Sequence, residues 1–202
     1  MTLHITQFEG SNALSSFRVQ QLLPALQGVH EKIAGISARF VHLVAGDSAP
    51  DAALSAQLAA LLTYGDPYTG PTDGPLIVVS PRLGTVSPWA SKATDIAHNC
   101  GLAVHRIERL VEYRLTLKNG LLSKTALTAG QLERVAALLH DRMTESAMLE
   151  RAQALGLFSA LQAAPMDHVD VLGGGKVALE AANKDWGLAL AADEIDYLVT
   201  VF

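Results

Sequence analysis

The run from Pro81 to Leu102 holds the residues whose types and spacing are best suited to binding a ligand. It follows the apolar segment 76–79, which predicts a short buried strand. Gly84 gives the next loop the freedom to turn, and Ser87 stands where a helix N-cap is expected, with Pro88 at the first helical position. The pattern therefore predicts a strand, a polar loop and a helix whose N-terminus faces outward.

Unpaired backbone N–H groups at such a helix start, with Arg82 and Lys92 nearby, would form a general anion site. The alternative is a capped core helix whose loop merely turns the chain. A Walker-type phosphate loop is excluded, because the glycine that must directly precede the lysine is missing.

The predicted helix has an apolar and a polar face. Helical spacing predicts that Trp89, Ala93, Ile96, Ala97 and Cys100 face the core, with Cys100 as an unreactive buried thiol. On the polar face, Asp95 and His98 stand three residues apart. They suggest either an acid/base pair or an ordinary surface hydrogen bond.

Other candidate sites are weaker. The seven histidines and the single cysteine lack the spacing of metal ligands, so no metal site is expected. Gly173 to Lys176 resembles a phosphate loop only superficially, because Asp170 and Val177 occupy positions that the motif reserves for glycine and for serine or threonine. A flexible joint is the simpler interpretation.

Composition limits the classes of function. Half of the 202 residues are apolar and 17% are charged, which is typical of a folded domain. The net charge of −5 gives no reason to expect nucleic-acid binding. One cysteine cannot form an internal disulfide, and no signal peptide or apolar run of membrane-spanning length is visible. A cytoplasmic protein without a membrane partner is expected.

The order strand, helix, strand, helix occurs twice, over residues 1–65 and 75–145. Strands are predicted at 3–8, 36–44 and 76–79, and residues 104–117 predict one long strand or a bent pair of strands. Helices are predicted to begin after Ser11 or Asn12, at Asp51, at Ser87 and at Thr128, the last with a capping box to Gln131. By pattern alone, this alternation predicts a parallel α/β sheet.

Apolar residues at helical spacing predict an inward face for the first helix and for the helix after Thr128. In the first helix that face includes Phe17, with Pro24 expected to bend or end the helix. In the helix after Thr128 it extends to Met143.

After residue 145 the character of the sequence changes. Residues 146–162 are rich in Ala and Leu and predict a helical connector, followed by a loop at 167–175 and a helix through Lys184. A last helix begins at Asp193, and its apolar stripe continues into Phe202 without a C-cap. This ending leads us to expect a piece of a longer polypeptide.

The central run from Gly84 to Gly101, GTVSPWASKATDIAHNCG, resembles the N-terminal region of large, single-chain phosphoribosylformylglycinamidine synthases. The resemblance extends over essentially the whole chain, through the segments 140–143, 169–173, 187–190 and 193–198. Leu83 and Ala90 depart from the proline and serine that are common in this family, and neither change removes a charge or the loop glycine.

The resemblance implies an α+β fold rather than a parallel sheet. It implies two βαβα halves, each like the small subunit of the split enzyme, packed as a pseudo-dimer into a mostly antiparallel sheet covered by helices. A helical linker region would follow. The implied divisions are an N-terminal domain at 1–145, a connector at 146–167 and the start of the linker domain at 168–202.

The resemblance also implies a function for the longer protein: a ligase of purine biosynthesis that uses ATP, magnesium and glutamine to convert formylglycinamide ribonucleotide to its amidine. Its synthetase and glutaminase domains would be the partners of this chain. No catalytic, cofactor-binding or metal-binding residue is expected within the 202 residues. The expected interdomain contacts are Arg82, Thr85, Ser87, Trp89, Ser91 and Lys92.

Burying a polar loop requires partners for its polar groups, which is why we select these residues. Exposure of a surface that other domains normally cover would also favour self-association. The alternative is a stand-alone α/β module that binds a phosphorylated ligand or a protein partner.

Overall fold

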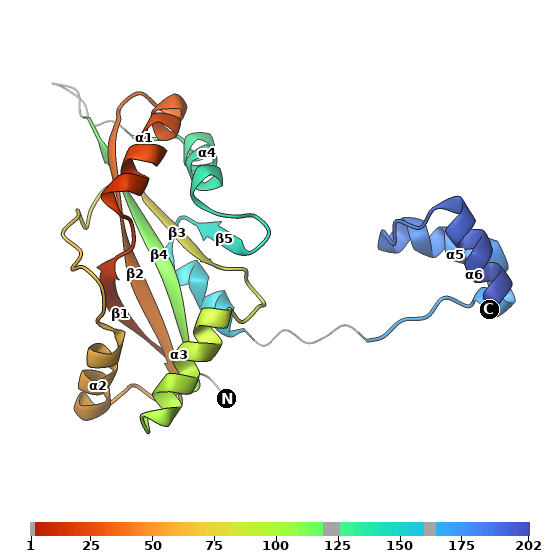
Figure 1. The fold of residues 1–202 in the computed structure, drawn as a ribbon, viewed down its shortest axis with the longest axis horizontal. Helices are drawn as coiled ribbons and strands as arrows, with labels where there is room; N and C mark the ends of the chain where they lie inside the picture. The colour runs from red at the N-terminus through yellow and green to blue at the C-terminus, as the bar shows by residue number, and fades with distance from the viewer. Residues whose placement is uncertain (1–2, 119–125, 160–164) are drawn as a thin grey trace. The chain divides into compact units, whose positions relative to one another are not determined.

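The computed structural model describes residues 3–118, 126–159 and 165–202. The chain divides into two compact units, residues 1–160 and 161–202 (Figure 1). The first unit contains all five strands, four α-helices and a 3-10 helix of the described chain, and the second contains two α-helices.

The sheet of the first unit is antiparallel throughout. Its strands are β1 (His4–Asn12), β2 (Ile33–Gly46), β3 (Leu76–Pro81), β4 (Arg106–Leu117) and β5 (Glu145–Met148). They lie in the order β1-β2-β4-β3-β5, and every neighbouring pair is antiparallel. The expected α+β class is confirmed, whereas the parallel sheet that the alternating pattern predicted is wrong. Alternation alone does not set strand direction, because the helix between β1 and β2 and the helix between β3 and β4 each return the chain to the neighbouring strand in the opposite direction.

Both halves contribute in the same way to the sheet. The first half comprises β1, α1 (Ser16–Val29), β2 and α2 (Ala52–Leu62), and the second comprises β3, α3 (Pro88–Asn99), β4 and α4 (Ala129–Leu139). In each half the first strand pairs with the second, and the two second strands pair with each other at the centre. Helix α1 packs on β2 and helix α3 on β4. This arrangement is what a duplicated unit would produce, and the superposition of the two halves stays a prediction.

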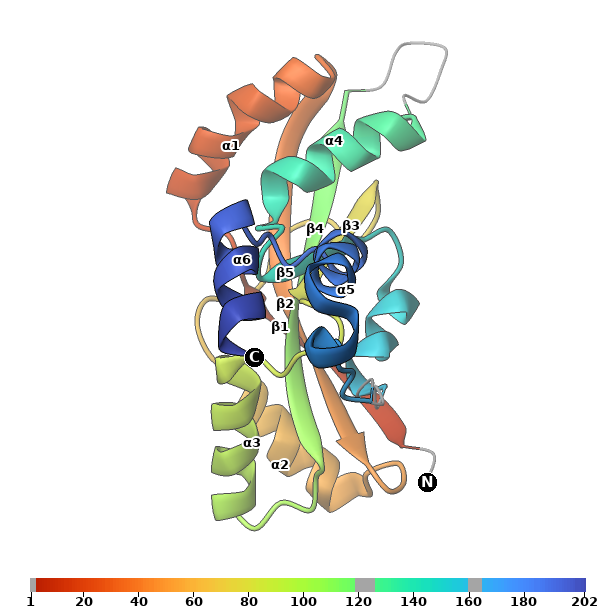
Figure 2. The ribbon, with the colours of Figure 1, turned by 90° about the vertical axis from the view of Figure 1, so that its right-hand side faces the viewer.

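Four helices cover one face of the sheet. Helices α1 (Ser16–Val29) and α4 (Ala129–Leu139) lie toward one end of the strands, and α2 (Ala52–Leu62) and α3 (Pro88–Asn99) toward the other (Figure 2). Three N-caps agree with the sequence prediction: Asp51, Ser87 and Thr128, the last in a complete capping box. The cap of α1 was predicted wrongly. It is Ser15, because Ser11 and Asn12 still belong to β1.

The faces of α1 and α4 also differ from the prediction. Phe17 is 65% exposed rather than inward, and α1 continues past Pro24 to Val29. Met143 is 77% exposed and lies beyond the end of α4. In both cases helical spacing of apolar residues led us to assign to the inward face a residue that does not contact the sheet.

The hydrophobic core has three parts. Under α1 and α4 it contains Leu26, Ile36, Ile77, Leu115 and Val135, and under α2 and α3 it contains Val44, Leu58, Ala97 and Ile107. Successive side chains of a strand point to opposite faces of the sheet. The alternate strand residues therefore form a third cluster on the other face, which contains Val41, Leu43, Val78 and Leu110 together with Leu157. The sheet is therefore covered on both faces over much of its length.

The segment after residue 144 forms a strand and a 3-10 helix instead of the predicted helical connector. Strand β5 pairs with β3, and Arg151–Phe158 forms the 3-10 helix η1. The sequence Glu-Ser-Ala-Met of β5 lacks the alternation and β-branched residues that would indicate a strand, so only the pairing with β3 decides its conformation.

The second unit is a pair of helices, α5 (Val171–Trp186) and α6 (Ala192–Val201). The side-chain amide of Asn183 fixes the connection between them, since it both donates to and accepts from the backbone of Leu190. The loop predicted at 167–175 is partly wrong, because the helix already begins at Val171. Gly175 interrupts it with non-helical angles (φ 54°, ψ −146°), so the expected joint is a kink within α5.

Candidate functional site

The loop between β3 and α3 is held in place by its own polar groups. The hydroxyl of Thr85 donates to the Arg82 carbonyl (2.6 Å), and the Arg82 N–H donates to the Thr144 carbonyl (3.0 Å). Gly84 adopts φ 83°, as the turn requires. Ser87 Oγ accepts from the N–H of Ala90 (3.0 Å) and caps α3. The loop therefore has one defined conformation.

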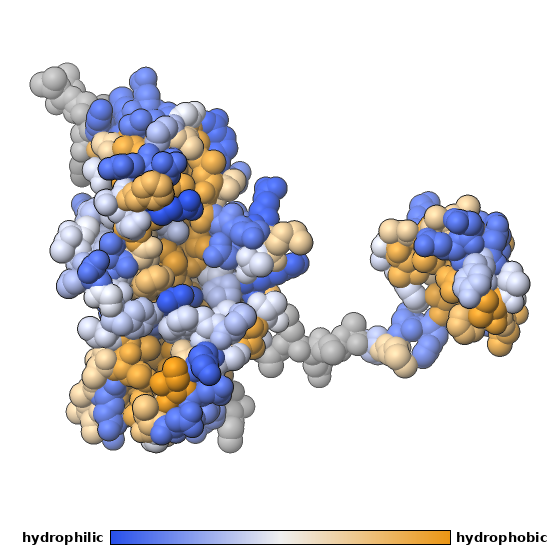
Figure 3. Space-filling view, viewed as in Figure 1, coloured by the Kyte–Doolittle hydropathy of each residue, from blue (hydrophilic) through white to orange (hydrophobic). Residues whose placement is uncertain are grey.

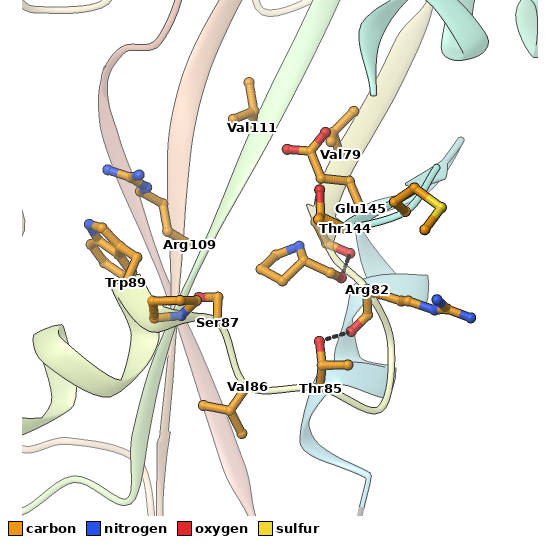
Figure 4. A pocket seen from close by; sticks show the side chains of 14 residues that line it. Val79, Arg82, Thr85, Val86, Ser87, Trp89, Arg109, Val111, Thr144 and Glu145 are labelled. Carbon is orange, nitrogen blue, oxygen red and sulfur yellow. Dashed lines mark hydrogen bonds between the residues drawn. The ribbon is translucent and has the colours of Figure 1, made fainter. Parts of the chain in front are cut away.

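A hollow of about 500 Å³ lies beside this loop on the helix-covered face of the sheet (Figure 4). Trp89 and Arg109 lie on one side of it, and Arg82, Thr85 and Thr144 on the other. Its remaining lining is largely apolar and includes Val79, Pro81, Val86, Pro88, Val111 and Met143, with Glu145 and Ser80 as further polar groups.

A second hollow, of about 320 Å³, lies between α2 and α3. It is lined by Leu61, Leu62, Tyr64, Trp89, Lys92, Ala93 and Ile96. Hydrophobic residues gather over this end of the domain in the space-filling view (Figure 3). Trp89 lines both hollows, and we call the two together the Trp89 groove.

The wall of the groove contains a stacked arginine. The guanidinium carbon of Arg109 lies 4.3 Å from the ring centre of Phe40 and 4.5 Å from that of Trp89, which is cation–π geometry on both sides. Arg109 Nη1 also donates to the hydroxyl of Tyr64 (3.2 Å). These contacts hold the cation in one place at the edge of the groove.

Behind the arginine lies a buried histidine. His42 is fully buried, its Nε2 is 2.8 Å from the Tyr64 hydroxyl, and its ring contacts Trp89. Burial, reinforced by the positive charge of Arg109, lowers the pKa of His42 from 6.5 to about 4. His42 is therefore neutral at pH 7 and supports the aromatic wall without adding a charge.

Residues 39–158, more than half of the chain, match the model of the family described as formylglycinamide ribonucleotide amidotransferase N-terminal. The chain belongs to this family. The match extends from β2 into η1, so it includes the whole lining of the Trp89 groove, whereas β1 and α1 lie outside it.

Five of the six residues selected from the sequence of this amidotransferase domain line the groove. Arg82, Thr85, Ser87 and Trp89 line the first hollow, and Trp89 and Lys92 the second. Ser91 lines neither, and its hydroxyl donates to the Ser87 carbonyl within α3 (3.3 Å). Their role as interdomain contacts stays a prediction.

Two predictions about the buried face of α3 are corrected, those for Ile96 and Cys100. Its buried residues are Ala90 and Ala97, while Ile96 is 43% exposed and Cys100 is also exposed. Small residues face the sheet because they allow α3 to approach β4 closely enough for Thr94 Oγ1 to accept from the Ile107 N–H (3.0 Å).

The acid/base pair considered for Asp95 and His98 is not formed. His98 Nε2 instead donates to the Val104 carbonyl (2.7 Å). This bond ties the end of α3 to the segment that leads into β4.

Sequence reasoning missed Phe40, His42, Tyr64 and Arg109. Alternation along β2 and β4 would have placed Phe40, His42 and Arg109 on one sheet face, but it gave no sign that the strands are neighbours. The pairing of β2 with β4 places His42 directly opposite Arg109.

The opposite face of the sheet carries a cluster of paired charges. The carboxylate of Glu112, 1% exposed, accepts from Arg39 (3.0 Å), Arg114 (3.2 Å) and Arg151 (Nε, 3.0 Å). Burial opposes its ionisation, but the hydrogen bonds and charges of Arg151 and Arg39 outweigh burial and lower the pKa of Glu112 below 4.5. Because Arg151 belongs to η1, the cluster attaches this segment to the sheet.

A second pair lies on the same face. Arg106 pairs with the buried Glu108 and also donates to the carbonyls of Leu157 (3.0 Å) and Thr85 (2.8 Å). Burial raises the pKa of Glu108 despite this partner. Arg106 thus connects β4 to η1 and to the loop that borders the groove.

Within residues 3–118, 126–159 and 165–202, no three His, Cys, Asp or Glu residues are arranged to hold a metal ion. No helix among these residues is long and apolar enough to cross a membrane.

Proposed function

We propose that this chain is the N-terminal domain and the beginning of the linker of a phosphoribosylformylglycinamidine synthase. The complete enzyme would use ATP, magnesium and glutamine to convert formylglycinamide ribonucleotide to formylglycinamidine ribonucleotide in purine biosynthesis, in the cytoplasm. The family match over residues 39–158 is the observation that carries this proposal.

The role of this domain in that enzyme would be architectural. It would pack the synthetase domain against the glutaminase domain and help to contain the ammonia that passes between them. The Trp89 groove supports this role, because exposed apolar residues such as Val86 and Met143 surround it, and such patches favour contact with another surface. ATP and magnesium would bind to other parts of the enzyme.

The hydroxyl groups around the groove also favour an architectural role. Ser87 is engaged in the cap of α3, and Thr85 in a turn. A serine or threonine nucleophile needs an adjacent base to activate it, whereas these two hydroxyls make hydrogen bonds that stabilise the loop.

The test is to divide the full-length synthase after residue 202 and to express the two parts separately. The larger part alone should retain synthesis of the amidine from free ammonia but lose most of its glutamine-dependent synthesis, and adding the 202-residue chain should restore the latter. Turnover of a purine intermediate by the 202-residue chain alone would overturn the proposal. Tight binding of ATP or formylglycinamide ribonucleotide to that chain in a calorimetric titration would favour the phosphorylated-ligand module instead.

A further inference from the structure

Three basic residues border the Trp89 groove, although the Arg82 side chain extends away from the first hollow (Figure 4). Arg82 and Arg109 line the first hollow, and Lys92 lines the second. Among the described residues, none of the three forms an ion pair with a carboxylate. By contrast, four arginines of the opposite sheet face do so: Arg39, Arg106, Arg114 and Arg151.

The groove differs in charge from the chain as a whole. The net charge of the chain is −5, yet Glu145 is the one acidic residue in the described lining of the two hollows. The Glu145 carboxylate already accepts from the Asp141 N–H (2.9 Å). A surface that is basic on an acidic protein selects partners of opposite charge.

Between these cations the groove is apolar. Trp89 separates two hollows, each wide enough for side chains of a partner, and Val86 (55% exposed) and Ile96 (43% exposed) line one hollow each. An occupant must therefore provide apolar side chains for the hollows as well as negative charge for the rim. A free phosphate would leave these apolar walls exposed to water.

We propose that the Trp89 groove binds a segment of the remaining synthase polypeptide in which one or more Asp or Glu residues are flanked by apolar side chains. The carboxylates pair with Arg109 and Lys92, Arg82 adds positive charge next to the first hollow, and the apolar side chains fill the hollows on either side of Trp89. The proposal rests on the proposed function, since it names the chemistry of the partner at the same surface.

Of the three cations, Arg109 is the one whose side chain is preorganised to bind a carboxylate. Its guanidinium is held between the rings of Phe40 and Trp89, so little conformational entropy remains to be lost when a carboxylate binds. Arg82 and Lys92 are exposed and would act mainly on the rate of association and its salt dependence.

Photo-crosslinking in the full-length synthase identifies the occupant. A benzophenone amino acid at Val86 lies in the first hollow, and the same probe at Phe17 on α1 is a control at a similarly exposed position outside the groove. Mass spectrometry of the Val86 product should find a downstream segment of the same polypeptide with Asp or Glu beside the crosslinked residue. A segment without an acidic residue, a crosslink to a second copy of the chain, or no product at Val86 would overturn the inference.

Charge reversal measures the contribution of the cations. The double variant Arg82→Glu/Lys92→Glu should weaken binding of the 202-residue chain to the separately expressed remainder by about tenfold or more. Lys32→Glu, directly before β2 and at the opposite end of that strand from His42 and Arg109, should change this binding less than twofold. Circular dichroism would establish that each variant is folded.

The outcomes separate the two proposals. If the unmodified chain fails to bind the remainder, the proposed function and this inference both fall. If it binds and the double variant binds equally well, only the inference falls. A calorimetric titration of the unmodified chain with inorganic phosphate should show no binding, and binding that the double variant abolishes would assign the groove to a phosphorylated ligand instead.

Discussion

Replacing Glu112 by glutamine should destabilise the first unit more than any other single change of a charged side chain to its amide. The Glu112 carboxylate is 1% exposed and accepts hydrogen bonds from Arg39, Arg114 and Arg151. Glutamine keeps the shape but removes the charge, so three guanidinium groups would face each other around a neutral amide. The amide NH₂ group would also point a donor at donors.

The size of the expected loss in free energy of unfolding depends on how exposed the arginines around Glu112 are. Breaking a buried ion pair by removing one member costs about 3–5 kcal/mol. The arginine side chains are 14–21% exposed and can regain some contact with water, so the lower end, about 3 kcal/mol, applies. For a protein of this size, each kcal/mol shifts the melting temperature by about 2–4 °C, which gives a decrease of about 6–12 °C.

The dependence on pH has a definite sign. The pKa of Glu112 is lowered in the folded state, so its contribution is fully present above about pH 4.5 and is lost as pH falls through the lower folded value. The difference between the wild type and Glu112→Gln should be constant from pH 7 to 5 and should diminish below pH 4.5.

Thermal unfolding followed by circular dichroism measures both effects. The matched control is Glu133→Gln, the same substitution at an exposed position of α4, and it should change the melting temperature by about 1 °C or less. A decrease of less than 2 °C for Glu112→Gln at pH 7, or a difference that persists unchanged at pH 3, would refute this account of the cluster.

Three further predictions concern the same unit. The pKa of His42 is about 4 in the folded protein and about 6.5 in the unfolded chain. Lowering the pH from 7 to 5 should therefore reduce the free energy of unfolding of the wild type by about 2 kcal/mol, and the His42→Gln variant should not show this reduction. Urea unfolding at both pH values measures the difference. Gly74→Ala should lower the free energy of unfolding by about 2 kcal/mol or more, since φ is 95° and the new Cβ would lie 2.6 Å from the Leu115 carbonyl oxygen. The control Gly28→Ala in α1, with open space around it, should raise the free energy of unfolding by about 0.5–1 kcal/mol. Equal effects of the two substitutions in denaturant titrations would contradict this. Thr128→Ala should cost about 1 kcal/mol by the same assay because it removes the cap of α4, and Thr128→Ser should restore most of that loss.

Elements governed by neighbouring residues were predictable from the sequence. Asp51, Ser87 and Thr128 each cap a helix because the side chain bonds to an N–H three residues later, which requires no distant partner. Gly84 adopts a positive φ for the same kind of local reason. The residues of the loop that borders the groove could therefore be selected before the fold was known.

Elements that depend on distant partners were not predictable in this way. The short strand β5 exists because β3 offers it an edge, and its own four residues carry no strand pattern. The buried face of α3 is set by close approach to β4, so alanines are buried and Ile96 is not. Helical spacing indicates that a helix has an apolar face, but it does not specify which residues of the helix pack against the sheet.

The sequence by itself determined where the chain turns, where three of the four helices of the first unit begin, and which family the chain resembles, because these properties reside in contiguous residues. The strand and helix pattern predicted a parallel sheet, and within the sequence only the resemblance to the family implied an antiparallel one. The tertiary structure alone decided that β2 lies against β4. That pairing places His42 beside Arg109, which is 67 positions later, on one face and Arg39 beside Glu112, which is 73 positions later, on the other. Pairing of strands is decided by the burial of both sheet faces at once, and no local stretch of sequence carries that information.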